Sequence, residues 1–306
     1  MFLSCLMRKI PVVDARLTAR DAARAAAQAR AAGSAVGALA GSSVFADLQG
    51  RILELLSSAT PCCVLRGTRF LELPAADRQP YVATLALLLG VVSDSNVFSE
   101  RSGAFVDEVR PSDPASKDVT FQLGACEAHA DESSKERPED VVALWCVRPA
   151  GWGGSSLLWL TPDVTAGIAE QHAGDDLIEV LRRPDFLFGG KLRQPPRILK
   201  APILFGKDGV RYRLGTIQDA AEVTNRPLRD DQQAAIRALT IATRTVLPYQ
   251  HPLAAGEALV WMNRRALHSR TDFDDRHRLL YRTRCFNDQL TNRADDQVEW
   301  LSGCDG

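Results

Sequence analysis

The sequence predicts a mainly β fold, a double-sheet barrel or jelly roll with α-helices packed outside it. From about residue 103 onward, short strand-like runs follow one another, separated by turn signals such as "PAGWGG" and "GKDG". Helical patterns fill most of the first hundred residues and return in one later insertion. Many short strands with turns between them are typical of β-sandwiches and barrels, and the helices then have only the outer faces of the sheets to cover.

The first hundred residues are expected to pack on this barrel as helices and one strand. Thr18 is a suitable N-cap and Gly33 a suitable end for an Ala/Arg-rich helix over residues 19–32. Apolar residues at helical spacing predict a second helix over 43–58, and a third is predicted over 75–92. Between them, "PCCVLRG" is a short apolar run closed by Gly67 and is expected to form a strand.

The remaining residues are expected to form the jelly-roll core, over 103–290, with a helical insertion over about 161–250. Helices are predicted at 161–171 and 229–247, and the strand-like runs are 103–110, 118–125, 141–148, 155–160, 198–206, 209–215, 257–263 and 279–286. No repeat or linker divides the sequence, so residues 1–306 are interpreted as one domain. The long Pro/Gly-rich stretch over 182–202 is expected to cover the active site.

Composition excludes several classes of function. Hydrophobic residues make up 45% and charged residues 25%, as in ordinary globular proteins. The net charge of −1 does not indicate binding to nucleic acid or to an anionic membrane. The longest apolar run, "LALLLGVV", is far shorter than the roughly 20 residues that span a bilayer, and the N-terminus lacks the features of a signal peptide. Seven cysteines without a C-x-x-C motif indicate reduced thiols and a cytoplasmic protein.

A metal site is suggested by His129 and Asp131 in "HAD", just before the apolar run "VVALWCV". Side chains two apart in a strand point to the same face. A third ligand is offered by His268, which follows the strand "ALVWM" and the turn "NRRA". Two histidines and one carboxylate form the facial triad that holds ferrous iron and leaves positions open for oxygen and a cosubstrate. The alternatives are a chance H-x-D and a hydrogen-bonded core histidine at 268.

The other histidines, His172, His251 and His277, are expected at the surface. Two arginines carry more information, because Arg278 and Arg282 lie four apart on "RLLYR" and share a strand face. A cation inside an apolar barrel needs an anionic partner, and the forked guanidinium suits a carboxylate. A bound dicarboxylate would supply that partner. The alternative is that both arginines are solvated on an edge strand.

Two stretches carry a resemblance to a known family. "HADESSKERPEDVVALWCVRPAGWGGSSLLWL" and "GEALVWMNRRALHSRTDFDDRHRLLYR" resemble the two signature regions of iron(II)/2-oxoglutarate oxygenases of the taurine dioxygenase and clavaminate synthase superfamily. The resemblance covers about residues 103–160 and 256–286, and "NRRALHSRT" is nearest the clavaminate synthase-like branch. It implies a double-stranded β-helix core of the cupin-like kind, with Fe(II), 2-oxoglutarate and O2 as reactants.

The resemblance also implies roles for single residues. The iron ligands would be His129, Asp131 and His268. Arg278 would hold the distal carboxylate of 2-oxoglutarate, and Ser156 in "GGSS" stands where the family usually has a threonine that joins this grip.

Three further residues are candidates for substrate contacts. Arg282 matches a second arginine that in relatives reaches an acidic group of the substrate or lies near the cosubstrate, so we expect it to hold a substrate anion. An acid from another strand that already neutralises Arg282 is the alternative. Glu132 and Ser133, just after the triad acid, are expected either to face the substrate or to form an exposed turn.

The expected reaction is hydroxylation of an unactivated C–H bond in a small molecule, an amino acid or a metabolite derived from one, with release of succinate and carbon dioxide. Desaturation and ring closure are alternative outcomes of the same chemistry. Halogenation is disfavoured because Asp131 keeps the carboxylate ligand in place. A non-catalytic metal- or ligand-binding relative and a protein-modifying hydroxylase remain as other classes.

Overall fold

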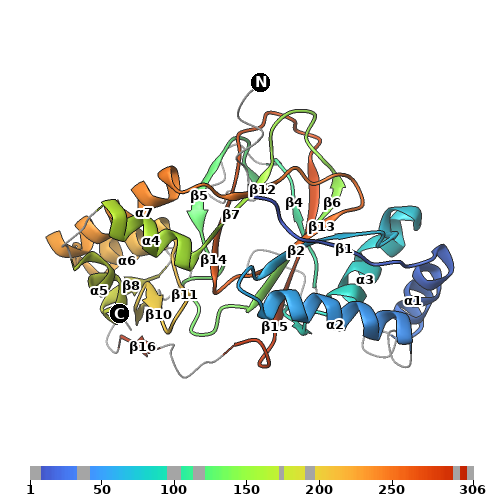
Figure 1. Ribbon diagram of the computed structural model, residues 1–306, viewed down its shortest axis with the longest axis horizontal. Coiled ribbons are helices and arrows are strands. Elements are labelled where there is room, and N and C mark those ends of the chain that lie inside the picture. The colour runs from blue at the N-terminus through green and yellow to red at the C-terminus, as the bar shows by residue number, and fades with distance from the viewer. Residues whose placement is uncertain are drawn as a thin grey trace.

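Two β-sheets face each other in the centre of the protein, and helices cover the outer side of each (Figure 1). The structure is a computed structural model, and it describes residues 8–32, 42–94, 105–112, 121–171, 176–189, 197–291 and 297–301. This arrangement confirms the predicted class, a mainly β fold with flanking helices.

The larger sheet has the strand order β1-β2-β13-β6-β15-β3, with β4 also paired to β15. Only β1 and β2 run parallel; the other neighbours are antiparallel. The smaller sheet has the order β12-β7-β14-β5. The strands of the larger sheet are β1 (Val12–Asp14), β2 (Cys62–Arg66), β3 (Val91–Val92), β4 (Asp107–Val109), β6 (Val141–Arg148), β13 (Ala258–Met262) and β15 (Leu279–Phe286). Those of the smaller sheet are β5 (Cys126–His129), β7 (Ser156–Leu160), β12 (Tyr249–His251) and β14 (Ala266–Arg270).

Three apolar layers follow from this stacking. The middle layer lies between the sheets and joins residues of both, such as Val64 and Trp261 from the larger sheet with Leu158 and Ala266 from the smaller one. The second layer packs the other face of the larger sheet against α1 (Ala19–Ala32), α2 (Ser43–Ser57), the short 3-10 turn at Phe70–Glu72 and α3 (Ala75–Ala86). Strand residues that alternate between two buried faces explain why "VVALWCV" is almost continuously apolar.

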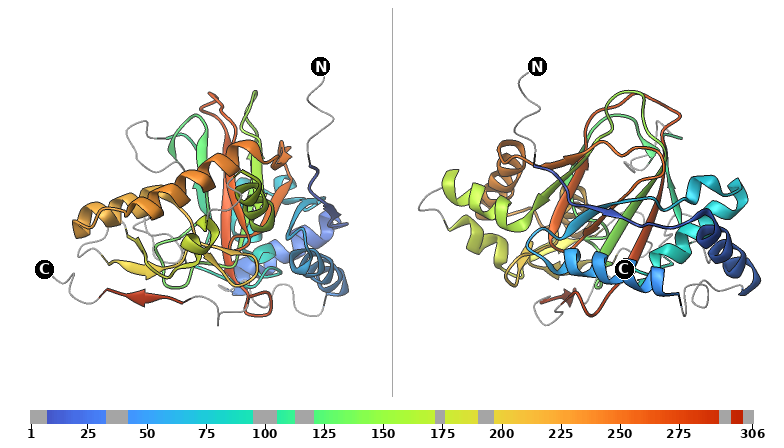
Figure 2. Two further views of the ribbon diagram at one scale, coloured as in Figure 1. Left: turned by 60° about the vertical axis from the view of Figure 1, so that its left-hand side comes forward. Right: turned by 45° about the vertical axis from the view of Figure 1, so that its right-hand side comes forward.

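The third layer covers the outer face of the smaller sheet with α4 (Thr161–Gln171), α5 (Leu177–Arg182), α6 (Leu214–Thr224) and α7 (Asp230–Thr245). A small sheet of β8 (Phe186–Phe188), β9 (Leu199–Ala201) and β16 (Glu299–Trp300) and the hairpin of β10 (Leu204–Phe205) and β11 (Gly209–Val210) complete this side. Figure 2 shows the two groups of helices on opposite sides of the strands.

Local chemistry explains the helix boundaries that were predicted well. The backbone N–H of Asp21 donates to the Thr18 hydroxyl, while the Thr18 N–H donates to the Asp21 carboxylate, so the start of α1 is capped in both directions. In α2, the apolar residues at helical spacing, Phe45, Leu48, Ile52 and Leu56, are the buried ones.

Several element predictions are wrong in detail. The helix expected to reach residue 92 ends at Ala86, and a turn follows in which Gly90, with a positive φ of 142°, leads the chain into β3. The run 209–215 is a strand only over Gly209–Val210, and α6 begins at Leu214. Within the run 118–125, residues 121–125 are not a strand and 118–120 lie outside the described residues. The strand begins instead at Cys126 and leads straight to His129.

The stretch 182–202 does not form one loop in its described part. Phe186–Phe188 and Leu199–Ala201 pair as strands β8 and β9, while residues 190–196 lie outside the described part of the chain. Its role as a cover therefore stays a prediction. Among the described helices, none is both long and apolar enough to cross a membrane.

The packing of α2 gives a test of the N-terminal layer. Ile52 is fully buried against the larger sheet, so Ile52→Ala should lower the free energy of unfolding by about 2–5 kcal/mol through lost burial and a cavity. Glu54→Ala, on the exposed face of the same helix, should change it by less than about 0.5 kcal/mol. Chemical denaturation measures both, and equal losses for the two variants would contradict this packing.

Candidate metal and cosubstrate site

Strand pairing brings the two predicted histidine ligands together. His129 is the last residue of β5 and lies directly opposite His268 in the antiparallel pair β5–β14. Their ring centroids are 4.2 Å apart. Asp131 follows two residues after β5 and is buried beside both rings. Ala130, between the two ligands, packs into the helical layer on the outer side of the sheet, as expected for a residue that points away from the metal.

The three side chains can present one ligand atom each within 4.8 Å of one another. Oδ1 of Asp131 lies 3.6 Å from Nε2 of His129 and 3.5 Å from Nε2 of His268. The Nδ1–H of His129 donates to the carbonyl of Glu127 at 2.8 Å, so the lone pair of Nε2 is free to bind a metal. This donor set, two imidazoles and one carboxylate on one side of a buried space, fits ferrous iron.

Electrostatics sets the protonation states that a metal needs. Burial alone would raise the pKa of Asp131, but Arg282 and Arg284 beside it, with the two histidines, hold that pKa well below its usual range. Burial lowers the pKa of His268 well below its usual range, and the neighbouring His129 lowers it further. An ionised carboxylate and a neutral imidazole are the forms that bind a cation.

The His268 ring lacks the outer hydrogen bond that His129 has. Its Nδ1 is buried and has no hydrogen-bond partner among the described residues, and the ring instead packs against Trp261 at 4.8 Å between centroids. The orientation of His268 therefore rests on packing and on the backbone pairing of β14.

Two buried residues that the sequence analysis did not single out hold the backbone around Asp131. The side-chain oxygen of Asn263 accepts the Asp131 N–H at 2.8 Å, and its amide donates to the carbonyls of Asp131 and Glu139 at 3.0 Å each. Arg211 donates to the carbonyls of Ser133 and Glu136 in the following turn. Asn263 is the first residue of "NRR", so the turn that begins there also supplies one side chain that holds the metal-site backbone.

A cavity between the sheets joins the two histidines of the triad to the predicted cosubstrate residues. Its lining includes His129, His268, Ser156, Arg278 and Arg282. The other lining residues are mostly apolar: Val109, Cys126, Leu144, Trp261, Ser269, Arg270 and Leu280. The structure thus brings five of the predicted residues to one space, with the imidazoles and a group of arginines on its walls.

Arg278 is a buried cation without a carboxylate partner in the described part of the chain. It is only 4% exposed, its guanidinium lies 4.8 Å above the Phe273 ring, and Nη2 of that guanidinium donates a long hydrogen bond of 3.5 Å to the carbonyl of Gly154. Burial, with repulsion from nearby Arg270, lowers the pKa of Arg278 to about 10, so it still carries its charge at neutral pH. A buried charge of this kind requires an anion.

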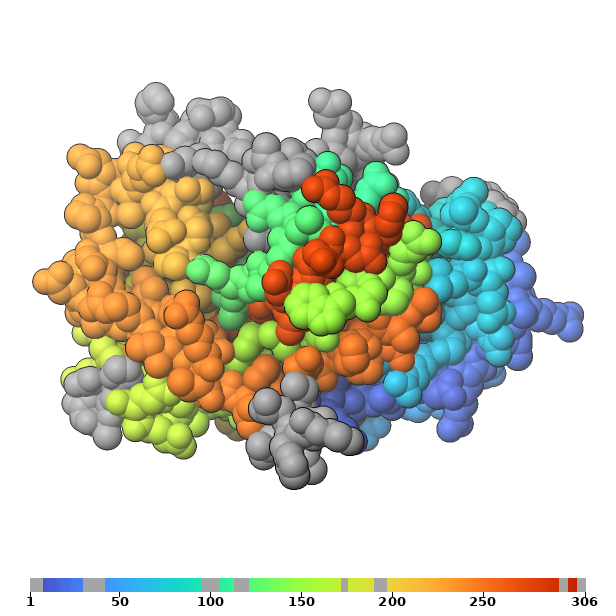
Figure 3. Space-filling model, turned by 90° about the horizontal axis from the view of Figure 1, so that it is seen from above, coloured from blue at the N-terminus to red at the C-terminus, as the bar shows by residue number. Residues whose placement is uncertain are grey.

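The "GG" of "GWGGSS" lets two loops approach each other closely at this end of the cavity. A Cβ on Gly153 would lie 1.9 Å from the carbonyl oxygen of Asp272, and a Cβ on Gly154 would lie 3.1 Å from Nε of Arg278. Both glycines also have positive φ. Figure 3 shows the loop between β6 and β7 (lime) beside the segment before β15 (red) on one face of the molecule.

The expected substrate residues fare differently. Arg282 lines the cavity, but Asp107 lies 3.2 Å and Asp131 3.4 Å from its guanidinium, so the premise that it lacks an anionic partner is wrong. Ser133 is buried and its hydroxyl lies 3.0 Å from that of Thr216, away from the cavity lining.

Glu132 lies in the turn directly after Asp131. It has a left-handed φ of 58°, a strained conformation for a non-glycine residue, and its carboxylate is 3.3 Å from Lys135. Of the three histidines expected at the surface, His277 is exposed, whereas His251 is a half-buried residue of β12 whose Nε2 lies 2.8 Å from Oε2 of Glu257. His172 lies outside the described residues.

With this geometry in hand, comparison with known proteins identifies the family. Residues 62–284 match the model of the family described as taurine catabolism dioxygenase TauD, TfdA family. The chain belongs to this family of dioxygenases, as the two signature stretches predicted. No curated protein matches the chain closely enough to show a relative.

Two oxygenases are among the solved structures with a similar fold. An asparagine oxygenase in complex with Fe(II), 3-hydroxyasparagine and succinate is 22% identical, with a TM-score of 0.69 over 90% of this chain and 93% of that one. The non-heme iron oxygenase OrfP in complex with Fe and α-ketoglutaric acid is 17% identical, with a TM-score of 0.62 over 91% and 95% of the two chains. Both likenesses confirm the predicted fold.

The contact between Gly154 and Arg278 can be tested directly. In Gly154→Ala the new methyl group would press on Nε of Arg278 and strain a left-handed residue, so 2-oxoglutarate affinity should fall by about 1 kcal/mol or more, about fivefold. Gly151→Ala in the same loop meets nothing nearer than 4.0 Å and should leave the affinity unchanged. Calorimetric titration with 2-oxoglutarate measures both, and equal affinities would separate Gly154 from the anion site.

Proposed function

We propose that the protein hydroxylates an unactivated C–H bond of an amino acid or a closely related small molecule, using Fe(II), O2 and 2-oxoglutarate. The observation that carries this proposal is the cavity that has His129, His268 and the buried Arg278 on its walls, with Asp131 beside both histidines. A structural metal site needs no such cation, whereas a metal-bound dicarboxylate cosubstrate does.

The triad residues would hold the iron, and Asp131 would bring the negative charge that a divalent cation favours. When bound, iron and 2-oxoglutarate together supply an oxidant strong enough to remove hydrogen from an unactivated C–H bond, with release of succinate and carbon dioxide. The protein orients the reactants and excludes water, and the apolar walls of Leu144, Trp261 and Leu280 serve the second purpose.

At the other end, Arg278 would pair with the distal carboxylate of 2-oxoglutarate. The ring of Phe273 and the close backbone of Gly154 keep its guanidinium in place before the anion arrives. Ser156 lines the same cavity and is proposed to donate its hydroxyl to that carboxylate, in place of the threonine usual in the family. A serine keeps this donor and loses only a methyl group.

The amino-acid substrate is supported by the relatives. The asparagine oxygenase is solved with 3-hydroxyasparagine, and OrfP is solved with 3-hydroxy-L-Arg and with a dihydroxy-L-Arg. In this chain, Arg282 and Glu132 are the charged candidates beside the triad for contacts to such a substrate. A substrate carboxylate at Arg282 would share this guanidinium with Asp107, so charge alone does not demand an acidic substrate.

We further propose a cytoplasmic location. Reduced thiols support it, because the described cysteines are all free: Cys62, Cys63, Cys126, Cys146 and Cys285.

The reaction can be tested by screening for succinate. The iron-loaded protein with 2-oxoglutarate should release succinate above its background rate with one or more free amino acids, beginning with asparagine and arginine, and the product should be heavier by one oxygen atom. His268→Ala should abolish this turnover and keep the fold, because it removes one of three metal ligands. Mass spectrometry and circular dichroism are the measurements. Metal binding without succinate release from any amino acid would indicate a non-catalytic relative.

The cosubstrate assignment has its own test. Arg278→Ala should weaken 2-oxoglutarate binding by about 2–5 kcal/mol, or about 30-fold to several thousand-fold, while iron affinity changes little. The reason is that a desolvated carboxylate would lose its charged partner. Isothermal titration of each ligand gives both affinities. A variant that binds 2-oxoglutarate like the native protein would place the anchor elsewhere, with Arg270 as the next cation in the lining.

A further inference from the structure

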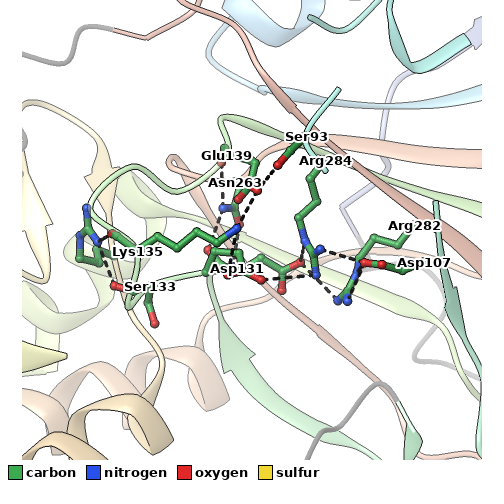
Figure 4. A network of polar contacts seen from close by, with 11 residues as sticks. Ser93, Asp107, Asp131, Ser133, Lys135, Glu139, Asn263, Arg282 and Arg284 are labelled. Carbon is green, nitrogen blue, oxygen red and sulfur yellow. Dashed lines mark hydrogen bonds and ion pairs between the residues drawn. The ribbon is translucent and has the colours of Figure 1, made fainter. Parts of the chain in front are cut away.

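The carboxylate of Asp131 faces two different sets of groups with its two oxygens. Oδ1 faces Nε2 of both histidines, at 3.5 and 3.6 Å. Oδ2 accepts from Nε of Arg284 at 3.2 Å and from the guanidinium of Arg282 at 3.4 Å (Figure 4). One oxygen is therefore available to a metal, and the other is engaged by two cations.

Arg284 is built into the fold at this point. It lies in β15 opposite Val142 of β6, so its backbone is fixed in the middle of the larger sheet, and only 4% of its side chain is exposed. Besides Asp131, it donates to Oδ2 of Asp107 at 2.8 Å, and it lies 3.7 Å from Glu132. Burial alone would lower the pKa of Arg284, but these three acids raise it, so the guanidinium is always charged.

Arg282 and Arg284 differ in what else they can do. Arg282 lines the cavity and its side chain is 16% exposed, so a ligand can reach it. Arg284 is absent from the cavity lining and points between Asp131 and Asp107, as Figure 4 shows. Its enclosure between two acids favours a role that acts through Asp131 over a direct contact with a substrate.

We infer that Arg284 is a positioning residue that holds Asp131 as a one-oxygen metal ligand. By donating to Oδ2, it turns Oδ1 toward the histidines and withholds the second oxygen from the metal. The open positions of the metal then remain for cosubstrate and oxygen. Asp107 accepts a hydrogen bond from Nη1 of Arg284 and so helps to hold this guanidinium against Asp131. This inference rests on the proposed metal site.

The test measures metal affinity rather than turnover. Arg284→Met, similar in bulk but without donors, should weaken binding of cobalt(II), a stable stand-in for ferrous iron, by about 10- to 100-fold, the usual effect of removing an outer partner of a metal ligand. In an Asp131→Ala background the same change should alter cobalt affinity by less than about twofold, because the residue through which it acts is gone. Arg265→Met, which removes an ion pair with Asp208 outside the cavity lining, should leave cobalt affinity unchanged.

The outcomes separate this inference from the proposed function. If the native protein does not bind cobalt at the triad, the metal site itself is wrong. If the native protein and Arg284→Met bind cobalt equally well, the inference is overturned. It is likewise overturned if Arg284→Met weakens cobalt binding equally with and without Asp131, because Arg284 then only supports the fold.

Circular dichroism and the midpoint of thermal unfolding show whether each variant is folded. Should Arg284→Met not fold, Arg284→Lys decides: it keeps the charge but not the Nε donor, and it should weaken cobalt binding by at least about threefold only when Asp131 is present. Unchanged cobalt affinity in the folded lysine variant would likewise overturn the inference.

Discussion

The burial of one carboxylate between two β-sheets is the constraint on which much of this structure depends. Asp131 is almost fully enclosed, and an isolated charge there would cost several kcal/mol. The protein offsets that cost with two guanidinium groups on one oxygen and with an amide that holds the backbone on either side of the residue. Arg282 and Arg284 lie in β15 of the larger sheet, and Asn263 directly follows β13 of the same sheet. The site is therefore assembled when this sheet stacks on the smaller one, which carries the two histidines.

The same constraint applies in the opposite sense at Arg278. There a cation is buried with an aromatic ring and backbone around it and with no carboxylate within reach among the described residues. Beside the triad, Arg282 and Arg284 thus have carboxylate partners, whereas on another wall of the cavity the Arg278 guanidinium has none among the described residues. A ligand that carries negative charge at a fixed distance from a metal-binding group complements such a cavity, which is why the distribution of charge says more about function than the fold does.

Layering explains why the site tolerates these charges. Helices cover both outer faces of the sheet pair, so the strands that carry the ligands are buried on both sides and held in register. Near the site, left-handed backbone lies in the connections: at Glu132 directly after Asp131, where it is strained, and at Gly153 and Gly154 beside Arg278, where glycine adopts it readily. Rigid strands thus place the ligand atoms, and the turns next to them direct the chain out of the cavity.

Much of this was accessible from the sequence. The helices over 19–32 and 43–58 are marked by a cap and by apolar spacing, which are local signals, and the triad and Arg278 stand in two motifs whose spacing and residue types specify their chemistry. Other features were not accessible, because they depend on residues far apart in the chain. The pairing of Arg282 with Asp107 and the role of Arg284 arise only when β4, β15 and the turn after β5 come together. The burial of Ser133 against Thr216 arises only when the same turn meets α6. A sequence reveals which groups can ionise, but whether a charge meets a partner inside the protein is decided by tertiary contacts across 80 to 180 residues, which local patterns do not encode.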